Sequence, residues 1–367
     1  MRFETYINVE KQERLKWLEG FQMEVGLRYF GGKAKSGRYI MNNIFNLAGY
    51  MNMYGEKADI LIDAYTGGGK IGLSVPDDSW FETIVLNDVD YGIYSFYMQC
   101  KNNPDALLKM ILAMGDAMSR EMFHKLASSR DRSICIGHEL TAAAMTFWVT
   151  MASRDGMTAP DRANYRLTRK DARTKKDDRE IEHEAIEEIK QTAQKRIPAL
   201  YAKLNSMNYV IENLEFKELL KKYNGKAYDD PDGNEYQAVA GLGEKNKLWY
   251  FDPPYFPPTL SGGKDAPYLY SSSIADTLET TTILHGDYED TYGEVKYFIK
   301  SDYDPKEFLD ENDKYYHAFD KLEESPFCKI LLGEFEKGAI DDEFKKTIGK
   351  EFIWCRGFPD NYETISI

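Results

Sequence analysis

The fold is decided by the stretch Leu248-Trp249-Tyr250-Phe251-Asp252-Pro253-Pro254-Tyr255, a hydrophobic run that ends in an acid, two prolines and a tyrosine. The run predicts a buried strand, and the prolines stop it because they lack a backbone N–H donor. A stiff turn is therefore expected at the carboxyl end of a strand, where open α/β sheets bind ligands. Asp252, the Pro253 carbonyl and the Tyr255 ring can together hold a flat ring that carries an amino group. An ordinary proline-rich surface turn is the alternative interpretation.

Length and composition limit the class of protein. The chain has 367 residues, enough for two domains or for one large domain with an insertion. It has no run of about 18 apolar residues, so no membrane span is expected. The N-terminus lacks the apolar core of a secretory signal, and the four cysteines lie far apart, which is typical of reduced thiols in a cytoplasmic protein. With five scattered histidines, no metal site is expected.

Charge is distributed unevenly along the chain. The formal net charge of −14 argues against non-specific adhesion to nucleic acid. Residues 161–176 nevertheless carry seven basic and two acidic side chains, whereas residues 285–350 carry eighteen acids and ten lysines. The basic island could contact phosphates, or it could be a solvated helix face balanced by the acids that follow it.

A second strand leads into a glycine-rich turn. Residues 58–65 predict a buried strand that ends at Asp63 and runs into Thr66-Gly67-Gly68-Gly69-Lys70. Glycines permit a tight turn and close approach of the backbone to a ligand. The next predicted strand, residues 83–88, ends in Asp88, where a carboxylate can bind both hydroxyls of a ribose. Together these features predict a nucleoside-cofactor site rather than a structural turn.

The remaining segments predict an α/β protein with many helices. Tyr29-Phe30-Gly31-Gly32-Lys33 precedes a helix that Ser36 can cap, and a lysine beside glycines there suits an anion. Helices are expected over 91–126, with a break near Pro104, and over 138–154. The charged stretch 170–196 predicts a solvent-exposed helix outside the sheet. Further strands are expected at 208–213, 295–300, 328–335, 351–355 and 362–367, with a flap over 256–275.

In this order the motifs resemble those of the Dam-type DNA adenine-N6 methyltransferases. They are F-G-G-K, D-A-Y-T-G-G-G, N-D, R-D-G-M…R-A-N-Y, E-F, D-P-P-Y and S-D-Y-D, and they extend from about residue 25 to the end of the chain. The resemblance implies a Rossmann-like class I methyltransferase sheet with a helical target-recognition insertion. It places the catalytic domain at 1–97 and 197–367 and the insertion at 98–196.

The resemblance also implies roles for individual residues. It gives the catalytic motif to Asp252, Pro253, Pro254 and Tyr255, and DNA contacts to Arg162, Asn164, Arg166 and Arg169. Contacts to S-adenosylmethionine are implied for Tyr29, Gly31, Gly32, Lys33, Asp63, Tyr65, Gly67, Gly69, Asp88, Glu215, Phe216 and Asp252. Several positions depart from the family pattern: the glycine loop begins T-G-G-G-K, Glu215 replaces an aspartate, and the segment after D-P-P-Y is acidic.

The expected activity is transfer of a methyl group from S-adenosylmethionine to an adenine flipped out of double-stranded DNA. Two alternatives are open. One is a cofactor-binding protein of the same fold that interacts with partners but does not methylate. The other is a methyltransferase that acts on RNA or on cytosine N4. The recognition sequence, the oligomeric state and the existence of a partner restriction nuclease are not given by the sequence.

Overall fold

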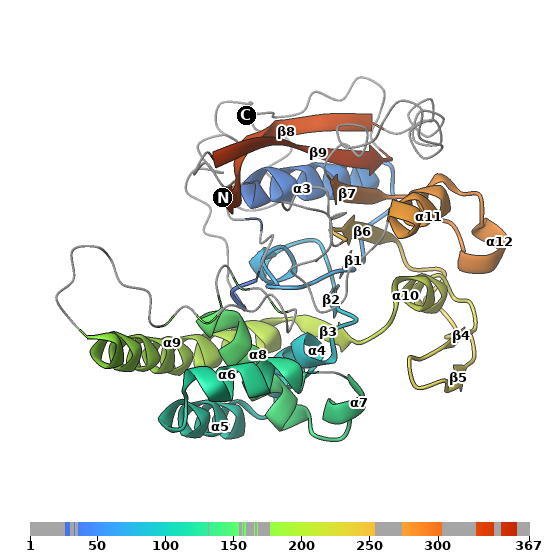
Figure 1. Ribbon diagram of the computed structural model, residues 1–367. Helices are drawn as coiled ribbons and strands as arrows, with labels where there is room; N and C mark the ends of the chain where they lie inside the picture. Colours follow the sequence, from blue (N-terminus) through green and yellow to red (C-terminus); the bar gives the residue numbers. More distant parts are fainter. Residues whose placement is uncertain are drawn as a thin grey trace.

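The computed structural model describes residues 26–29, 33, 36–130, 132–153, 156, 158, 165, 167, 177–253, 274–302, 328–340 and 346–357. Its centre is a seven-stranded sheet of order β3-β2-β1-β6-β7-β9-β8 (Figure 1). The strands are β1 (Ile60–Asp63), β2 (Thr83–Asn87), β3 (Asn208–Glu212), β6 (Lys247–Phe251), β7 (Phe298–Asp302), β8 (Cys328–Ile340) and β9 (Lys346–Arg356).

The sheet is mainly parallel. Strands β3, β2, β1, β6 and β7 run in the same direction, and β9 pairs antiparallel with both β7 and β8. This arrangement confirms the predicted Rossmann-like class. Two short strands, β4 (Tyr228–Asp229) and β5 (Glu235–Tyr236), form a separate antiparallel ribbon. The strand expected at 362–367 and most of the flap expected at 256–275 lie outside the described residues.

Alternating side chains of the central strands feed two hydrophobic cores. In β6, Leu248 and Tyr250 belong to one core, and Trp249 and Phe251 belong to the other. All four are at most 1% exposed. A strand buried on both faces needs a continuous apolar run, which is the pattern that the sequence shows there. The sheet is therefore the middle layer of three.

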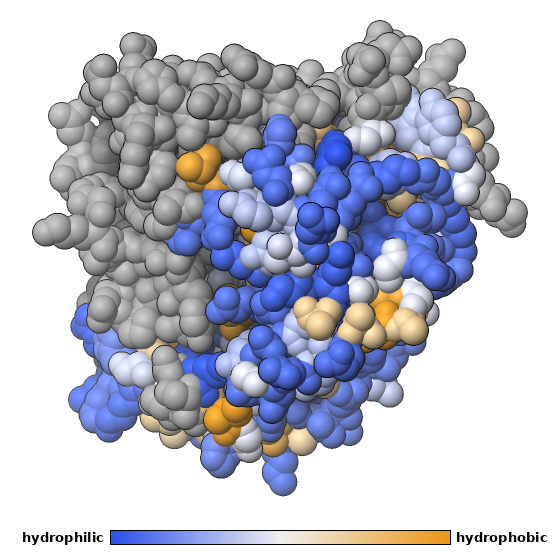
Figure 2. All heavy atoms as spheres, turned by 90° about the vertical axis from the view of Figure 1, so that its right-hand side faces the viewer, coloured by the Kyte–Doolittle hydropathy of each residue, from blue (hydrophilic) through white to orange (hydrophobic). Residues whose placement is uncertain are grey.

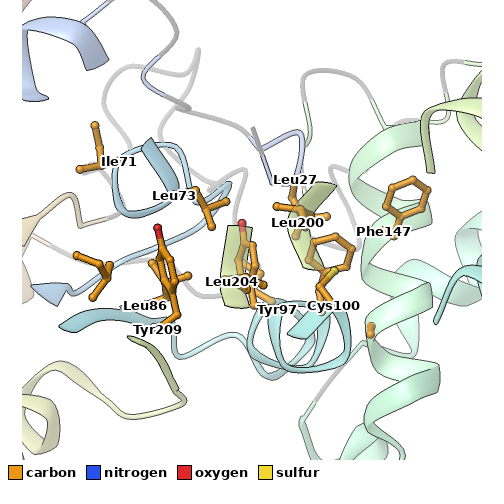
Figure 3. Close-up of a cluster of buried hydrophobic side chains, with 14 of the residues drawn as sticks. Leu27, Ile71, Leu73, Leu86, Tyr97, Cys100, Phe147, Leu200, Leu204 and Tyr209 are labelled. Atoms are coloured by element: carbon orange, nitrogen blue, oxygen red, sulfur yellow. The ribbon is translucent and has the colours of Figure 1, made fainter. Parts of the chain in front are cut away.

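Helices cover both faces of the sheet. The larger core includes side chains of α3 (Gly37–Met53), α4 (Tyr91–Asn102) and α9 (Asp178–Ser206). The smaller core includes side chains of α10 (Phe216–Tyr223) and α11 (Ile274–His285). On the larger side, Leu73, Leu27, Tyr97 and Leu204 meet beneath the turn that follows β1 (Figure 3). This packing supports the glycine-rich turn from below.

In the chain, a group of helices lies between β2 and β3, which pair directly in the sheet, and this group is called the helical layer. It consists of α4, α5 (Pro104–Asp116), α6 (Arg120–Ser128), α7 (Arg132–Cys135), α8 (Glu139–Ala152) and α9 (Figure 1). The predicted break falls at Pro104, which begins α5 because the first helical position needs no N–H donor. The first helix of the layer is α4 and the last is α9. The bounds 98 and 196 expected for the insertion fall inside these two helices.

The prediction for the charged stretch 170–196 is wrong in part. The helix α9 extends from Asp178 to Ser206, and the side chain of its N-cap residue, Asp177, forms a capping box with Glu180. One stripe of α9 is buried, so the helix is part of the core rather than an exposed appendage; its residues are Ile186, Ile189, Ala193, Ile197, Leu200 and Leu204. The charged residues mask this stripe in the sequence because they dominate the overall composition.

The expected cap of α3 is also wrong. Ser36 is buried, already has helical backbone angles, and makes no side-chain capping bond. The turn into the helix is made instead by the N–H of Gly37, which donates to the Lys33 carbonyl at 3.0 Å. Lys33 is therefore fixed to the start of α3.

The face that carries α10, α12 (Glu289–Tyr292) and the β4–β5 ribbon is mostly hydrophilic, with small scattered apolar patches (Figure 2). Within the described part of the chain, no helix combines the length and the apolar character needed to cross a membrane.

A buried ion pair connects helices of this layer next to the end of β2. Nη2 of Arg130 lies 2.6 Å from Oδ2 of Asp90, and the two side chains are 1% and 3% exposed. Asp90 also caps α4 by accepting the N–H of Gly92, and Arg130 donates to the Thr146 hydroxyl in α8. The pair therefore connects the end of α6, the start of α4 and the middle of α8.

Replacement of Arg130 should destabilise the protein strongly. Arg130→Met leaves Asp90 buried without its cation, so the free energy of unfolding should fall by about 3–5 kcal/mol. Lys125→Met is a suitable control, because it removes an exposed ion pair with Glu121 on the same helix and should leave the stability nearly unchanged. Denaturant unfolding measures both. Equal stability of the two variants would contradict this role of Arg130.

Candidate active site

Three carboxylates meet at the carboxyl edge of the parallel strands. Asp63 is the last residue of β1, Asp88 follows β2, and Asp252 follows β6. Strand β1 pairs in parallel with both neighbours, so the three strand ends lie side by side. The chain order reverses at β1, and this switch point is where open α/β sheets bind ligands. The structure thus brings together three acids that the sequence analysis singled out separately.

The glycine turn after β1 has a backbone that other residues would strain. Gly67 and Gly69 have φ angles of +47° and +73°. A Cβ on Gly67 would lie 2.8 Å from the Tyr29 ring, so Tyr29 packs directly on the turn. The Gly67 N–H donates to Oδ2 of Asp88 at 2.8 Å, and the Tyr97 hydroxyl donates to the Gly67 carbonyl at 3.1 Å. The turn is thus held from both sides.

Asp63 is a buried carboxylate with one unfilled acceptor. The side chain is 1% exposed, and its Oδ2 accepts the N–H of Gly72 at 3.0 Å. Its Oδ1 has no hydrogen-bond partner among the described residues. Burial raises the pKa of Asp63 to about 8; the backbone N–H groups of Gly72 and Tyr65 oppose this change, and the charges of Asp252 and Asp88 reinforce it. Asp63 therefore favours a donor or cationic ligand beside Oδ1.

Asp88 is oriented by backbone donors. Its Oδ1 accepts the N–H of Asp90 at 2.9 Å, while Oδ2 takes the Gly67 N–H. Burial and then the charge of Asp90 raise the pKa of Asp88, against the N–H donors and the positive charge of Arg130. Asp88 is only partly buried as a residue, unlike Asp63.

The preceding residue, Asn87, joins three strand ends. Its Nδ2 donates to the carbonyls of Ala64 and Leu214 at 3.0 Å each, and its Oδ1 accepts the Leu214 N–H at 3.0 Å. The side chain of Asn213 adds bonds to the carbonyls of Asp88 and Val89. Hence the N-D motif combines a structural residue, Asn87, with an acid that faces the site.

Aromatic rings form the wall beside the turn. The rings of Tyr65 and Phe216 stack with centroids 6.1 Å apart, and Phe216 meets Phe251 edge-on at 5.5 Å. Burial raises the pKa of the Tyr65 hydroxyl, which keeps it neutral. Glu215 is exposed at the N-cap position of α10 and makes no capping bond with its side chain. Phe216 of the E-F pair thus packs on Tyr65, the residue directly before the glycine turn.

The structure brings Lys33 to the acid of the D-P-P-Y motif. Nζ of Lys33 lies 2.7 Å from Oδ1 of Asp252, and Pro253 is buried. The predicted site residues outside the described part of the chain are Gly31, Gly32, Pro254, Tyr255, Arg162, Asn164, Arg166 and Arg169. Among the described residues of this region, Ser153 and Tyr165 form an antiparallel bridge.

Sequence reasoning missed the residues that orient Asp88. Asp90 could have been recognised, because an aspartate directly before a helix is a frequent N-cap. Arg130 carried no signal, since a single arginine in a charged region is normally exposed. Tyr97 was equally hidden within a helical stripe.

The sheet order, the glycine turn and the acids at the switch point define a class I methyltransferase. The family model for the D12 class N6 adenine-specific DNA methyltransferases matches residues 29–238, more than half of the chain. The chain therefore belongs to this family, and it is a site-specific adenine-N6 methyltransferase whose substrate is DNA. This result selects among the alternatives that the sequence left open.

The match includes Asp63, Asp88 and Phe216, and it ends before Asp252. No curated protein matches the chain. The assignment of Asp252 consequently rests on its motif and on its position beside the two other acids.

The buried acid Asp63 should make stability depend on pH. Between about pH 4 and pH 8 the folded protein keeps a proton on Asp63 that the unfolded chain has lost, so stability should fall as the pH rises through this window. Asp63→Asn cannot titrate and should lose less stability between pH 5 and pH 8, by on the order of 1 kcal/mol. Denaturant unfolding of ligand-free protein at both pH values measures the difference. Asp78→Asn, at an exposed position, controls for the loss of one carboxylate; identical pH profiles of Asp63→Asn and wild type would contradict the burial argument.

Proposed function

We propose that the protein takes its methyl group from S-adenosylmethionine bound at the carboxyl edge of β1 and β2. The observation that carries the proposal is the buried Asp63, whose Oδ1 has no partner among the described residues and lies beside a glycine turn. An unfilled buried acceptor is costly unless a ligand supplies a donor. The ammonium group of the cofactor is a donor of this kind.

The other residues around the turn fit the remaining parts of the cofactor. Asp88 has the position from which a carboxylate can accept hydrogen bonds from ribose hydroxyls. Phe216 offers a ring face for the adenine, with Glu215 and Tyr65 beside it. Gly67 and Gly69 let the backbone approach closely, and Tyr29 packs on the same turn. Gly31 and Gly32 are proposed to complete the cofactor site.

The D-P-P-Y turn is proposed to position the target amine. S-adenosylmethionine supplies an electrophilic methyl group on a sulfonium. Asp252 and the Pro253 carbonyl accept hydrogen bonds from the two amino hydrogens of adenine. These bonds orient the nitrogen lone pair for attack on the methyl group. Pro254 keeps the turn rigid, and Tyr255 stacks on the base. Much of the rate then comes from positioning rather than from proton transfer.

Adenine N6 lies inside a base pair, so the base must leave the duplex, at a cost of a few kcal/mol. Stacking on Tyr255 offsets about 1–3 kcal/mol of this cost. The helical segment 98–196 is proposed as the target-recognition region, with Arg162, Asn164, Arg166 and Arg169 as its DNA contacts. In a chain of net charge −14, such a basic segment would provide the local attraction that the remainder lacks.

Cofactor binding can be tested by calorimetry. S-adenosylmethionine should bind the wild-type protein and stabilise it by about 2.7 kcal/mol at a hundredfold excess over the dissociation constant. Asp63→Ala should weaken binding strongly because it removes the buried acceptor. Asp78→Ala, at an exposed position, should bind as the wild type does. A flat titration of the wild-type protein with both the cofactor and its thioether product would refute the proposed cofactor.

The roles of Asp252 and Tyr255 predict different losses. Asp252→Ala should lower the rate of methyl transfer at saturating cofactor, because the lost bond is made with the reacting group. Tyr255→Ala should impair base extrusion, whereas Tyr255→Phe should keep most activity because the ring face is sufficient. Transfer of a labelled methyl group to duplex DNA, together with 2-aminopurine fluorescence at the target base, reports both steps. Wild-type transfer by Asp252→Ala, or equal defects in the two Tyr255 variants, would show that these roles are wrong.

A further inference from the structure

Lys33 forms an ion pair with the proposed acceptor of the target amine. Its ammonium lies 2.7 Å from Oδ1 of Asp252, and the two side chains are 5% and 18% exposed. The backbone of Lys33 is held by the first turn of α3 through the N–H of Gly37. The backbone of Lys33 is therefore fixed at the start of α3, and its ammonium group lies against the turn that follows β6.

Two other acids lie at the same edge of the sheet as Asp252. The neighbouring strand β1 ends in Asp63, which is buried, and the negative charge of Asp252 is one cause of the raised pKa of Asp63. Asp88 adds a third acid to the same edge and also raises the pKa of Asp63. A carboxylate close to other carboxylates in a poorly solvated site loses its charged form unless a cation compensates.

The ionised form matters for the reaction. The amino group of adenine donates hydrogen bonds, so the residue that orients it must accept them. An ionised carboxylate is an acceptor only, whereas a protonated carboxyl also presents an O–H donor. Loss of the charge on Asp252 would therefore place a donor where the amine needs an acceptor.

We propose that Lys33 is a positioning residue for methyl transfer, which keeps Asp252 ionised and fixes the direction of its carboxylate. This inference rests on the proposed function, because it takes Asp252 as the acceptor of the target amine. It differs from the role that the family resemblance implies for Lys33, which is contact with the cofactor. The two roles predict opposite effects on binding and on rate.

The first experiment separates binding from rate. Lys33→Met should bind S-adenosylmethionine within about threefold of wild type but lower the single-turnover rate of methyl transfer on the order of 100-fold. Lys33→Arg retains the charge and should recover at least a tenth of the wild-type rate. Lys203→Met is the matched control, since Lys203 makes a 2.6 Å ion pair with Asp77 and is 18% exposed, and it should keep the wild-type rate.

A double-mutant cycle tests whether Lys33 acts through Asp252. Asp252→Asn removes the charge and keeps a carbonyl acceptor, so Lys33→Met should change the rate of this variant less than threefold. The double variant has lost both charges and should fold, which protects the test against a misfolded single variant. If the rate of Asp252→Asn is too low to measure, the rates of Lys33→Arg and Lys33→Met are compared instead. Recovery of the rate by Lys33→Arg would then support the inference, and no recovery would overturn it.

The outcomes are distinct. A normal rate at saturating cofactor with weakened cofactor binding in Lys33→Met would overturn the inference and return Lys33 to the cofactor. An equal loss of rate in the wild-type and Asp252→Asn backgrounds, or no recovery by Lys33→Arg, would also overturn it. Absence of methyl transfer to DNA by the wild-type protein would instead contradict the proposed function itself.

Discussion

The structure depends on how three neighbouring carboxylates are accommodated at one edge of the sheet. Parallel pairing of β1 with β2 and β6 forces Asp63, Asp88 and Asp252 together. Like charges at short range in a poorly solvated site repel one another strongly. The chain opposes this repulsion with backbone N–H groups of Gly67, Gly72 and Asp90, and with one lysine. The edge is therefore prepared for a ligand that brings positive charge and hydrogen-bond donors.

Buried residues of the helical layer help to hold this edge of the sheet in place. Arg130 neutralises Asp90, whose N–H holds Asp88, and it donates to the carbonyl of Thr158 at 3.4 Å. Gly156, near Thr158, packs so tightly on the Arg28 carbonyl that a Cβ would lie 2.7 Å from that oxygen. Gly156 and Thr158, in the stretch that resembles a DNA-contacting hairpin, are therefore in contact with Arg28 and Arg130. Arg130 thus contacts both Thr158 and Asp90, the residue whose N–H is bonded to Asp88.

Much of this organisation could be predicted from the sequence, because the signals were local. Continuous apolar runs gave β1 and β6, glycines gave the turn, and acids at the strand ends gave the ligand edge. Long-range contacts could not be predicted in this way. No periodicity indicates that Arg130 is buried, that Lys33 meets Asp252, or that Asn87 bridges three strand ends. In α9 the local signal was misleading, since abundant charges concealed a buried stripe that only the packing against α4 and α5 reveals.

The order of the strands also has a consequence for folding. Strand β1 lies between β2, which follows it closely in the chain, and β6, whose Lys247 pairs with Ile60. The whole helical layer, β3 and α10 lie between β1 and β6 in the chain. Contacts between residues this distant in sequence form slowly. During synthesis, one edge of β1 therefore stays unpaired until β6 has been made. A chain cut at residue 238, where the family match ends, would leave that apolar edge exposed for good. Such a fragment would contain most of the cofactor-side residues and yet be prone to aggregate through β1.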